Sequence, residues 1–437
     1  MSLTDAQRDL AAAGQLDCPT CHKAFPYYDE ANSVFFACPH CATYFKLETG
    51  KRPEVLDHFK APHFVPQVLP LGATGLMPDG REYRIVGFMA KHEAKSMNYR
   101  WGEYALFSPP AHYAQLSVFE GHWQFIRPEA EHRIIRPNTR EAEVRVGDDV
   151  YELYNKYSPR LQHAVGEFSW NARDSHRLIV QEFVAPPYML VHEQLHDTAS
   201  WFWAEHLEPG QVAEAFGLPA TAMPDRHGVG AIQPPPGDAT WKPLLTFTLL
   251  MALAVVLAQV FISTAKSRHW VLQETYSTQP DPAPTAVAGQ GAVIVTPSFE
   301  VHGPTALNFE LKVGLDNQWL ELPVNLVNEQ TGQSWEFTKT IEYYHGYEGG
   351  ESWSEGSTEG DATLHDIPSG RYHVNLYPQS ETGQPMMVQL RVEENTPLQS
   401  NLLLMLLLLF AWPVIQYLRR RYHTQQRWAS SDYGPQE

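Results

Sequence analysis

Two long uncharged apolar runs divide this chain of 437 residues into separate parts. The first run, LLTFTLLMALAVVLAQVFIST, covers residues 244–264, and the second, LLLMLLLLFAWPVIQYL, covers residues 402–418. As α-helices they would be about 32 Å and about 25 Å long, close to the roughly 30 Å thickness of the hydrocarbon core of a bilayer. Because soluble helices rarely run this long without a polar face, we expect two transmembrane helices rather than two buried core helices.

The residues that flank the two runs predict their orientation. Three arginines, residues 419–421, directly follow the second run, and such clusters favour the cytoplasmic side. Lys266 and Arg268 after the first run argue the other way, but this rule loses force for long translocated loops. We therefore expect a protein of the inner (cytoplasmic) membrane with two spans, with both termini in the cytoplasm and residues 265–400 extracytoplasmic.

All four cysteines lie in one short segment, CPTCHKAFPYYDEANSVFFACPHC. Each C-P-x-C pair predicts a tight turn that offers two thiolates to one face of a tetrahedral ion, and two such turns complete a shell of four. We expect a zinc ion held by Cys18, Cys21, Cys38 and Cys41, with a purely structural role because no coordination position stays open. The alternatives are a rubredoxin-like iron centre, a redox-active dithiol, or thiols without a role.

The thiols and the charges indicate the surroundings of each part. Thiols stay reduced in the cytoplasm, and all four precede the first run while none lies in residues 265–400. Residues 1–240 hold 21 Lys and Arg against 30 Asp and Glu, and residues 265–400 hold 6 against 18. Phosphate backbones repel a chain with a formal net charge of −18, so we expect no nucleic-acid partner.

The start of the chain shows no cationic stretch followed by an apolar run, so we expect no signal peptide and an amino-terminal region that stays in the cytoplasm. The stretch MSLTDAQRDLAAA predicts a short helix within residues 1–15. His22 and His40 lie inside the two cysteine turns and could replace a cysteine as a ligand, but the presence of four thiols argues against this.

Short aromatic and β-branched runs bounded by turn residues predict strands on both sides of the first apolar run. We therefore expect a mainly β multidomain membrane protein. Its expected parts are a zinc ribbon with a short N-terminal helix (1–50), a β-rich, barrel-like cytoplasmic domain (65–220), a Pro-rich linker (221–241), a transmembrane helix (244–264), a second linker (265–291), an extracytoplasmic β-sandwich of about seven strands (292–396), a second transmembrane helix (402–418) and a cytoplasmic tail (419–437).

The stretch HEQLH offers a second candidate metal site. His192 and His196 have the i, i+4 spacing of two ligands on one face of a helix, and Glu193 would be the general base of a zinc peptidase. The preceding residues, YMLVHEQ, read as a strand, and no third ligand is evident. A polar strand-to-turn segment is the interpretation that we favour.

An acidic segment of the outer region, YHGYEGGESWSEGSTEGD, could hold a hard cation such as calcium. Its spacing matches no calcium-binding loop, and we favour a solvated flexible loop. The acidic residues concerned are Glu348, Glu351, Glu355, Glu359 and Asp361.

The middle of the chain resembles the bacterial family catalogued as domain of unknown function 4178. The resemblance rests on LGATGLMPDGREYRIVGFM, RWGEYALFS, GHWQFIRP, VGEFSW, EFVAPPYMLVHEQ and WFWAEHLEPGQVAEAF, and covers roughly residues 65–220. It implies a zinc-ribbon-like start but no known activity. The outer region is similar, more loosely, to transthyretin-like or carboxypeptidase-regulatory-type sandwiches through VNLVNEQTGQ and LHDIPSGRYHVNLYP.

These features predict a membrane-anchored zinc-binding adaptor or sensor that links a cytoplasmic docking domain to an extracytoplasmic sandwich, in envelope stress or maintenance. We recognise no catalytic constellation and assign no catalytic residue. A flat aromatic surface around Trp101, Trp123 and Trp203 would favour docking, whereas a deep pocket with converging carboxylates such as Glu103 and Glu193 would favour a membrane-tethered metal-dependent hydrolase. An accessory subunit of a membrane channel or transport complex is a third alternative. The expected partners are the lipid bilayer and other proteins, with homo-oligomerisation as a further option.

Overall fold

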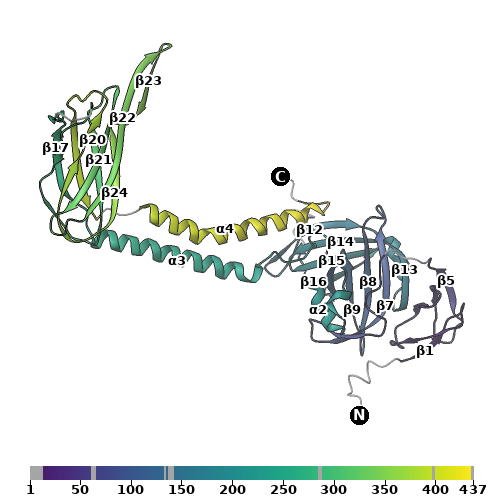
Figure 1. Ribbon diagram of the computed structural model, residues 1–437. Coiled ribbons are helices and arrows are strands. Elements are labelled where there is room, and N and C mark those ends of the chain that lie inside the picture. The colour runs from purple at the N-terminus through teal and green to yellow at the C-terminus, as the bar shows by residue number, and fades with distance from the viewer. Residues whose placement is uncertain are drawn as a thin grey trace. The chain divides into compact units, whose positions relative to one another are not determined.

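The computed structural model describes residues 13–60, 65–131, 134–135, 142–283, 288–395 and 399–434. The chain divides into two compact units, one made of Met1–Lys242 with Val414–Glu437 and the other of Pro243–Pro413. Strands dominate both units, which confirms the mainly β character expected from the sequence (Figure 1).

Within the described residues, a 14-stranded antiparallel sheet forms the body of the first unit. In spatial order its strands are β11 (Glu143–Val146), β12 (Asp149–Tyr157), β14 (Leu178–Ala185), β15 (Tyr188–Leu195), β16 (Thr198–Leu207), β10 (His122–Glu129), β9 (His112–Phe119), β8 (Arg100–Ser108), β7 (Glu82–Glu93), β13 (Pro159–Phe168), β3 (Phe35–Ala37), β4 (Thr43–Lys46) and β5 (Glu54–His58), and β6 (Thr74–Leu76) pairs with β7.

The sheet curls because two consecutive strands, β12 and β13, pair with the two ends of the same series of strands. β12 pairs with β14, and after the single residue Ser158 the chain continues as β13, which pairs with β7. The strands from β14 to β7 are thereby joined at their two ends through the chain itself. Across the interior, the ring of Trp101 on β8 lies 5.5 Å from that of Tyr157 at the end of β12.

Alternation of side chains gives this sheet two different faces. On β9, Ala114, Leu116 and Val118 are buried in an outer core, while Gln115 and Ser117 line the interior. The short helix α2 (Pro209–Ala215) covers part of the outer core with Val212 and Ala213. On β9 the apolar face therefore packs outward under α2, and the inward face is polar.

The second half of the cysteine segment is part of the same sheet, so the boundary expected at residue 50 falls within continuous structure. β3 pairs with β13 through Ala37 and Gly166, and β5 extends the sheet beyond that boundary. Gly166 has a φ of 94°, and a Cβ there would lie 2.2 Å from the carbonyl oxygen of Val86. This close crossing of three strands is possible only with glycine.

Of the helix expected over residues 1–15, residues 1–12 lie outside the described part of the chain. Gly14 and Gln15 belong instead to strand β1 (Gly14–Asp17), which pairs with β2 (Ala24–Tyr27). β1 and β2 form a separate two-stranded sheet that carries the first cysteine turn.

The expected linker 221–241 and the expected tail 419–437 both pack on the first unit. Ile232 is buried, and helix α3 (Asp238–Ala265) begins before the linker was expected to end. Helix α4 (Gln399–Ala429) continues beyond the apolar run. The hydroxyl of Tyr154 donates a hydrogen bond to the carbonyl of Arg427 at 2.9 Å, and Trp428 packs on the Tyr154 ring at 5.6 Å. These aromatic contacts hold the last turn of α4 on the sheet.

Helices α3 and α4 contain the two apolar runs. Both are long and apolar enough to cross a membrane, and most side chains of their apolar windows are exposed. Phe247, Phe261 and Leu407 are 60%, 71% and 66% exposed. Such helices are stable in lipid, where apolar side chains face hydrocarbon, rather than in water.

The second unit contains a β-sandwich (Figure 1). One sheet has the order β17 (His269–Ser277), β27 (Met387–Glu394), β20 (Thr305–Val313) and β24 (Glu359–Ile367). The other has the order β18 (Ile294–Val295), β25 (Gly370–Leu376), β21 (Gln318–Asn328), β22 (Ser334–Glu348) and β23 (Glu351–Gly356), with β19 (Phe299–Val301) on β25 and β26 (Gln379–Ser380) on β21.

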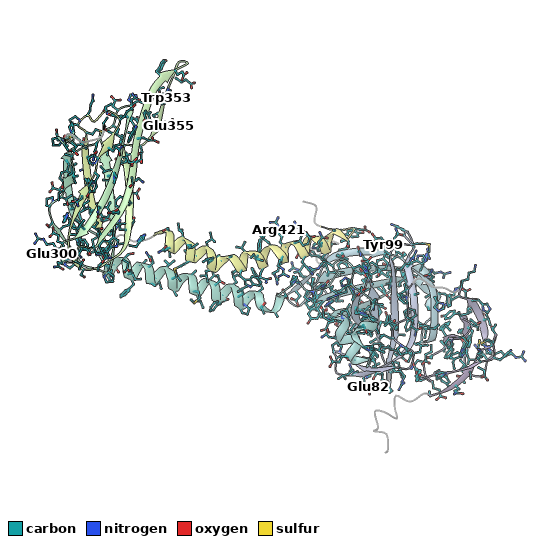
Figure 2. The ribbon with its side chains drawn as sticks, in the orientation of Figure 1. Glu82, Tyr99, Glu300, Trp353, Glu355 and Arg421 are labelled. Atoms are coloured by element: carbon teal, nitrogen blue, oxygen red, sulfur yellow. The ribbon has the colours of Figure 1, made fainter. Side chains whose placement is uncertain are left out.

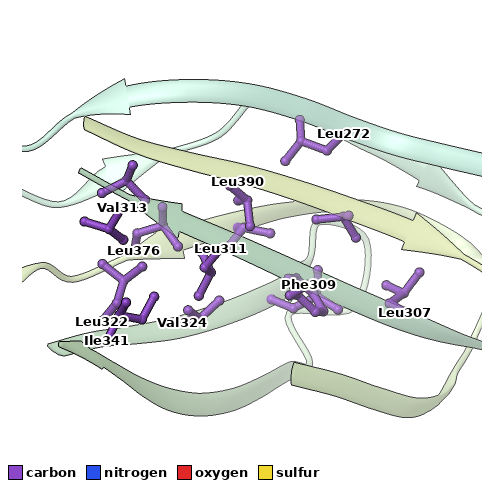
Figure 3. Packing of buried hydrophobic residues seen from close by; sticks show 14 of the residues in the cluster. Leu272, Leu307, Phe309, Leu311, Val313, Leu322, Val324, Ile341, Leu376 and Leu390 are labelled. Atoms are coloured by element: carbon purple, nitrogen blue, oxygen red, sulfur yellow. The ribbon is translucent and has the colours of Figure 1, made fainter. Parts of the chain in front are cut away.

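Alternating apolar residues of the two sheets form the core of the sandwich (Figure 3). Leu307, Phe309 and Leu311 of β20 are fully or almost fully buried. Tyr372 of β25 is also buried, and its hydroxyl donates a hydrogen bond to the carbonyl of Pro368 at 2.9 Å. The IPSGRY stretch thus closes one end of the sandwich through a satisfied buried hydroxyl.

Two expectations for the outer region are wrong. The linker expected over 265–291 contains β17, which belongs to the sandwich because Leu272 packs into its core. The acidic segment is a regular hairpin of β22 and β23, in register from Tyr343↔Gly356 to Glu348↔Glu351, rather than a flexible loop. Figure 2 labels Trp353 and Glu355 on this projecting hairpin.

Candidate functional site

The four cysteine thiols converge as the sequence predicts. The Sγ atoms of Cys18 and Cys41 lie 3.6 Å apart, and those of Cys21 and Cys38 lie 3.7 Å apart. All four Sγ atoms lie within 4.8 Å of one another. A tetrahedral zinc ion with bonds of about 2.3 Å requires sulfur atoms about 3.8 Å apart. The thiol geometry therefore fits a zinc ion.

The two cysteine turns have the same local conformation. The backbone N–H of His22 donates to the carbonyl of Cys18 at 3.0 Å, and that of Ala42 donates to Cys38 at 2.9 Å. His22 and Ala42 have φ values of 57° and 56°. This left-handed conformation costs a non-glycine residue roughly 1–2 kcal/mol. In both turns this strained conformation places two thiols so that they point toward the same position.

The surroundings of the thiols differ. Burial raises the pKa of Cys38 to about 12. Burial also raises that of Cys41, but hydrogen bonds from the hydroxyl and the backbone amide of Thr43 outweigh it and bring this pKa to about 6. The Thr43 hydroxyl lies 3.0 Å from Cys41 Sγ and 3.0 Å from His58 Nδ1, so it orients this ligand. His22 and His40 are exposed and lie outside the cluster.

A second candidate site is a cavity of about 300 Å³ inside the curved sheet. It adjoins another of about 390 Å³, and Lys91, Gln115 and Glu193 line both. Four of the charged residues that line it come from four different strands: Lys91, Glu103, Glu182 and Glu193. The rings of Trp101, Tyr157 and Phe202 complete the wall.

The buried charges are partly paired. Lys91 Nζ lies 2.5 Å from Glu103 Oε2, and the side chains are only 10% and 13% exposed. The indole N–H of Trp101 donates to Glu103 Oε1 at 2.6 Å. The hydroxyl of Tyr157 donates to Glu182 Oε1 at 2.8 Å. Glu103 is thus neutralised by a lysine, whereas Glu182 has a neutral partner.

Two of these carboxyls have strongly raised pKa values. Burial raises the pKa of Glu182 to about 7 against the lowering effect of the Tyr157 hydroxyl, and the charge of Glu103 raises it further. Burial likewise raises the pKa of Glu193 to about 7, although Lys91 lowers it. Near neutral pH, these carboxyls can each hold or release a proton, and a cation in the cavity would favour their ionised form.

Strand alternation explains which of these residues the sequence could reveal. Glu193 lies two residues after Val191 on β15, and Glu182 lies two residues after Val180 on β14, so the carboxylates share an inward face with apolar residues. Sequence reasoning selected Glu103 and Glu193 but missed Glu182, Lys91 and Tyr157. A charged residue at the inward position of an otherwise apolar strand face was the available signal.

The zinc-peptidase alternative for HEQLH is wrong. His192 lies on strand β15, where it is buried, 3.1 Å from Gln181 Oε1 through Nδ1 and 4.5 Å from the Trp201 ring. His196 lies in the following turn with a φ of 53° and is exposed. The two histidines therefore lack the shared helix face on which the zinc-peptidase motif depends.

The flat aromatic surface expected for docking is also absent among the three tryptophans named for it. Trp123 is fully buried and stacks on Tyr104 in the outer core. Trp101 is buried at the cavity, and Trp203 packs on Tyr188 at 4.9 Å. Alternation sends these rings to different sides of the sheet.

Comparisons with known proteins add little about activity. No curated protein matches the chain. A solved structure of a Clostridium thermocellum endo-1,4-beta-D-xylanase 10B (CBM22-1 and GH10 modules) is 10% identical with a TM-score of 0.16, and the match covers 30% of this chain and 25% of that one. A structure of infectious bursal disease virus (Gx strain) is 8% identical with a TM-score of 0.17, covering 88% and 68% of the two chains.

A structure of carbohydrate-binding modules from the beta-sandwich superfamily is 7% identical with a TM-score of 0.14, covering 69% of this chain and 96% of that one. TM-scores this low establish no shared fold. Residues 74–209 match the model of the family described as "Domain of unknown function (DUF4178)", which supports the resemblance seen in this part of the sequence.

Proposed function

We propose that this protein is a two-span protein of the inner membrane that acts as a sensor or adaptor, and that its cytoplasmic unit binds a small cationic ligand in the carboxylate-lined cavity. The convergence of Glu103, Glu182 and Glu193 around the buried Lys91 in the interior of the sheet is the observation that carries this proposal. The thiolate centre holds a structural zinc ion in the same unit. The sandwich, with its transthyretin-like sequence features, lies on the extracytoplasmic side.

The ends of the two apolar helices support this topology. Asp238 at the start of α3 accepts a hydrogen bond from Arg420, which follows the apolar run of α4, at 2.7 Å. The guanidinium of Arg420 also lies 5.5 Å from the ring of Trp241. The start of α3 and the end of the apolar run of α4 lie together in the first unit, which agrees with two antiparallel spans. The arginine cluster that follows the run favours the cytoplasm for this unit.

The charge of the cavity selects the ligand class. After Lys91 neutralises Glu103, neither Glu182 nor Glu193 forms an ion pair within the described residues, and the other lysine of the lining, Lys156, is exposed. An organic ammonium or guanidinium would supply the missing charge, and Trp101 and Tyr157 would offer ring faces to it. A volume of about 300 Å³ suits a small molecule.

Butylamine is expected to bind the full-length protein in detergent with a Kd in roughly the millimolar range, and butanol at least about tenfold more weakly, as measured by calorimetry at pH 8. Glu193→Gln and Glu182→Gln should each weaken butylamine binding about tenfold or more, because an ion pair becomes an ion–dipole contact. The exposed Glu152→Gln on β12 is the matched control. Equal binding of butanol and butylamine would contradict the proposal.

A membrane-tethered hydrolase is the second candidate function. Carboxyls with a pKa of about 7, such as Glu182 and Glu193, suit general acid–base catalysis near neutral pH. Turnover of a bound cationic ester or amide, lost in Glu193→Gln while binding of butylamine persists, would favour this function over a sensor.

A further inference from the structure

A second cluster of metal-ligating side chains lies at one end of the sandwich, separate from both sites above. His269 begins β17, His302 lies between β19 and β20, and Glu394 ends β27. One ligand atom of each lies within 4.8 Å of the others. We propose that His269, His302 and Glu394 bind a zinc ion. This inference does not depend on the proposed function.

The spacing of the ligand atoms fits one ion. Glu394 Oε2 lies 2.9 Å from His269 Nε2 and 3.8 Å from His302 Nδ1. A tetrahedral zinc ion with bonds of about 2.0–2.1 Å separates its ligand atoms by about 3.3 Å. The distances of 2.9 Å and 3.8 Å lie on either side of this value, so shifts of about half an ångström in the exposed imidazoles would complete the geometry.

The carboxylate of Glu394 is the buried anchor of the cluster. Its side chain is 0% exposed, and Oε1 accepts a hydrogen bond from the backbone N–H of His302 at 2.8 Å. Oε2 makes no hydrogen bond within the described residues, although two imidazole nitrogens face it. A buried carboxylate oxygen without a hydrogen bond is costly, and a cation between the three side chains removes that cost.

Contacts of the neighbouring residues hold the backbone around two of the ligands in place. Asn395, next to Glu394, donates through Nδ2 to the carbonyl of Ser267 at 3.2 Å and accepts through Oδ1 from the Thr305 hydroxyl at 3.1 Å. A Cβ on Gly303, next to His302, would lie 2.1 Å from the carbonyl oxygen of Ile367, so this connection is tightly packed. Ligands held in place before the ion arrives lose little entropy on binding.

The donor set indicates the kind of ion and site. Two imidazoles and one carboxylate suit zinc, and three protein ligands leave a fourth position open, unlike the closed thiolate centre. The side chains of His269 and His302 are 48% and 77% exposed, so the ion would be reachable from solvent. The site would exchange zinc readily and could take a further ligand at the open position.

The test is zinc binding by the full-length protein in detergent, stripped with chelator and reloaded with zinc alone, then measured by elemental analysis. The wild type should retain about two ions per chain, since it has one closed and one open site. The double variant His269→Ala, His302→Ala should retain about one zinc ion per chain. The triple variant that also carries Cys38→Ser should retain none. His365→Ala, an exposed histidine elsewhere in the sandwich, is the matched control and should retain both.

Cobalt provides a second readout that a folding defect would not imitate. The histidine variant should lose the weaker cobalt absorption of nitrogen and oxygen ligands and keep the intense thiolate-to-cobalt bands. A wild type that holds only the thiolate-bound ion would overturn the proposal, because the cluster would then be an ion pair of Glu394 with protonated histidine. Zinc content unchanged in the histidine variant would overturn it equally.

Discussion

Cys38→Ser is expected to release the proposed zinc ion and to unfold the segment that carries β3 and β4. Cys38 is fully buried, and its pKa is raised to about 12 by burial, so without a metal this thiol stays neutral. Structural zinc sites of this type contribute about 10–16 kcal/mol of apparent binding free energy, which is also folding free energy. Elemental analysis and limited proteolysis of the amino-terminal segment would measure the two losses.

The damage should spread into the large sheet. Tyr44 on β4 is fully buried, and its hydroxyl donates to Asn171 Oδ1 at 3.1 Å and accepts from the N–H of Ala172 at 3.0 Å. These contacts join the cysteine segment to the residues that follow β13. The thermal midpoint of the whole first unit should therefore fall, not only that of the cysteine segment.

His40→Ser is the matched control because His40 lies between Cys38 and Cys41 in the same turn but is exposed and outside the cluster. It should keep the metal and the wild-type thermal midpoint. A Cys38→Ser protein that retained its metal, or that lost it without a change in the melting of the sheet, would contradict this account.

The cysteine centre was predictable because its information is local. Four thiols in two identical turns specify one tetrahedral shell, whatever the rest of the chain does. The pairing of β3 with β13 was not predictable, because Ala37 and Gly166 are far apart in the sequence. The residue pattern of neither strand indicates which strand it pairs with. The sequence therefore predicted a separate domain for residues 1–50, although β3 and β4 continue the large sheet.

The cavity shows the same division between local and non-local information. Alternation predicts that Glu193 and Val191 share a face of β15, but not which face is interior. That choice depends on the closure of the sheet through Ser158 and on α2, which covers the opposite face. β17 was missed for a related reason: HWVLQETYS follows an apolar helix directly, and only its pairing with β27 marks it as part of the sandwich.

The return of the chain to the cavity links the two apolar helices to the candidate ligand site. Ser430 and Asp432, just after α4, line the cavity together with Tyr154 and Asn155. The N–H of Asp432 donates to Asn155 Oδ1 at 3.4 Å. A ligand in the cavity would therefore contact the segment that continues from the second apolar helix, as a sensor requires.

Glu182→Gln and Glu193→Gln are each expected to stabilise the ligand-free protein at pH 8 and to leave its stability nearly unchanged at pH 4.5. Burial raises both pKa values from 4.5 to about 7, so the folded state binds these protons more tightly than the unfolded state does. This contribution to stability is complete below about pH 4.5 and is lost as the pH rises through 7. A shift of this size corresponds to up to about 3 kcal/mol for each carboxyl, and less if water in the cavity solvates the charge.

Urea unfolding at the two pH values, followed by tryptophan fluorescence, would measure these differences. Glu167 also has a pKa raised by burial to about 7, but it is present in every variant and cancels in the comparison. The exposed Glu152→Gln should change nothing at either pH. If both cavity variants unfolded like the wild type at pH 8, the carboxylates would already be neutralised without a ligand. The cavity would then have no unmet negative charge with which to attract a cation.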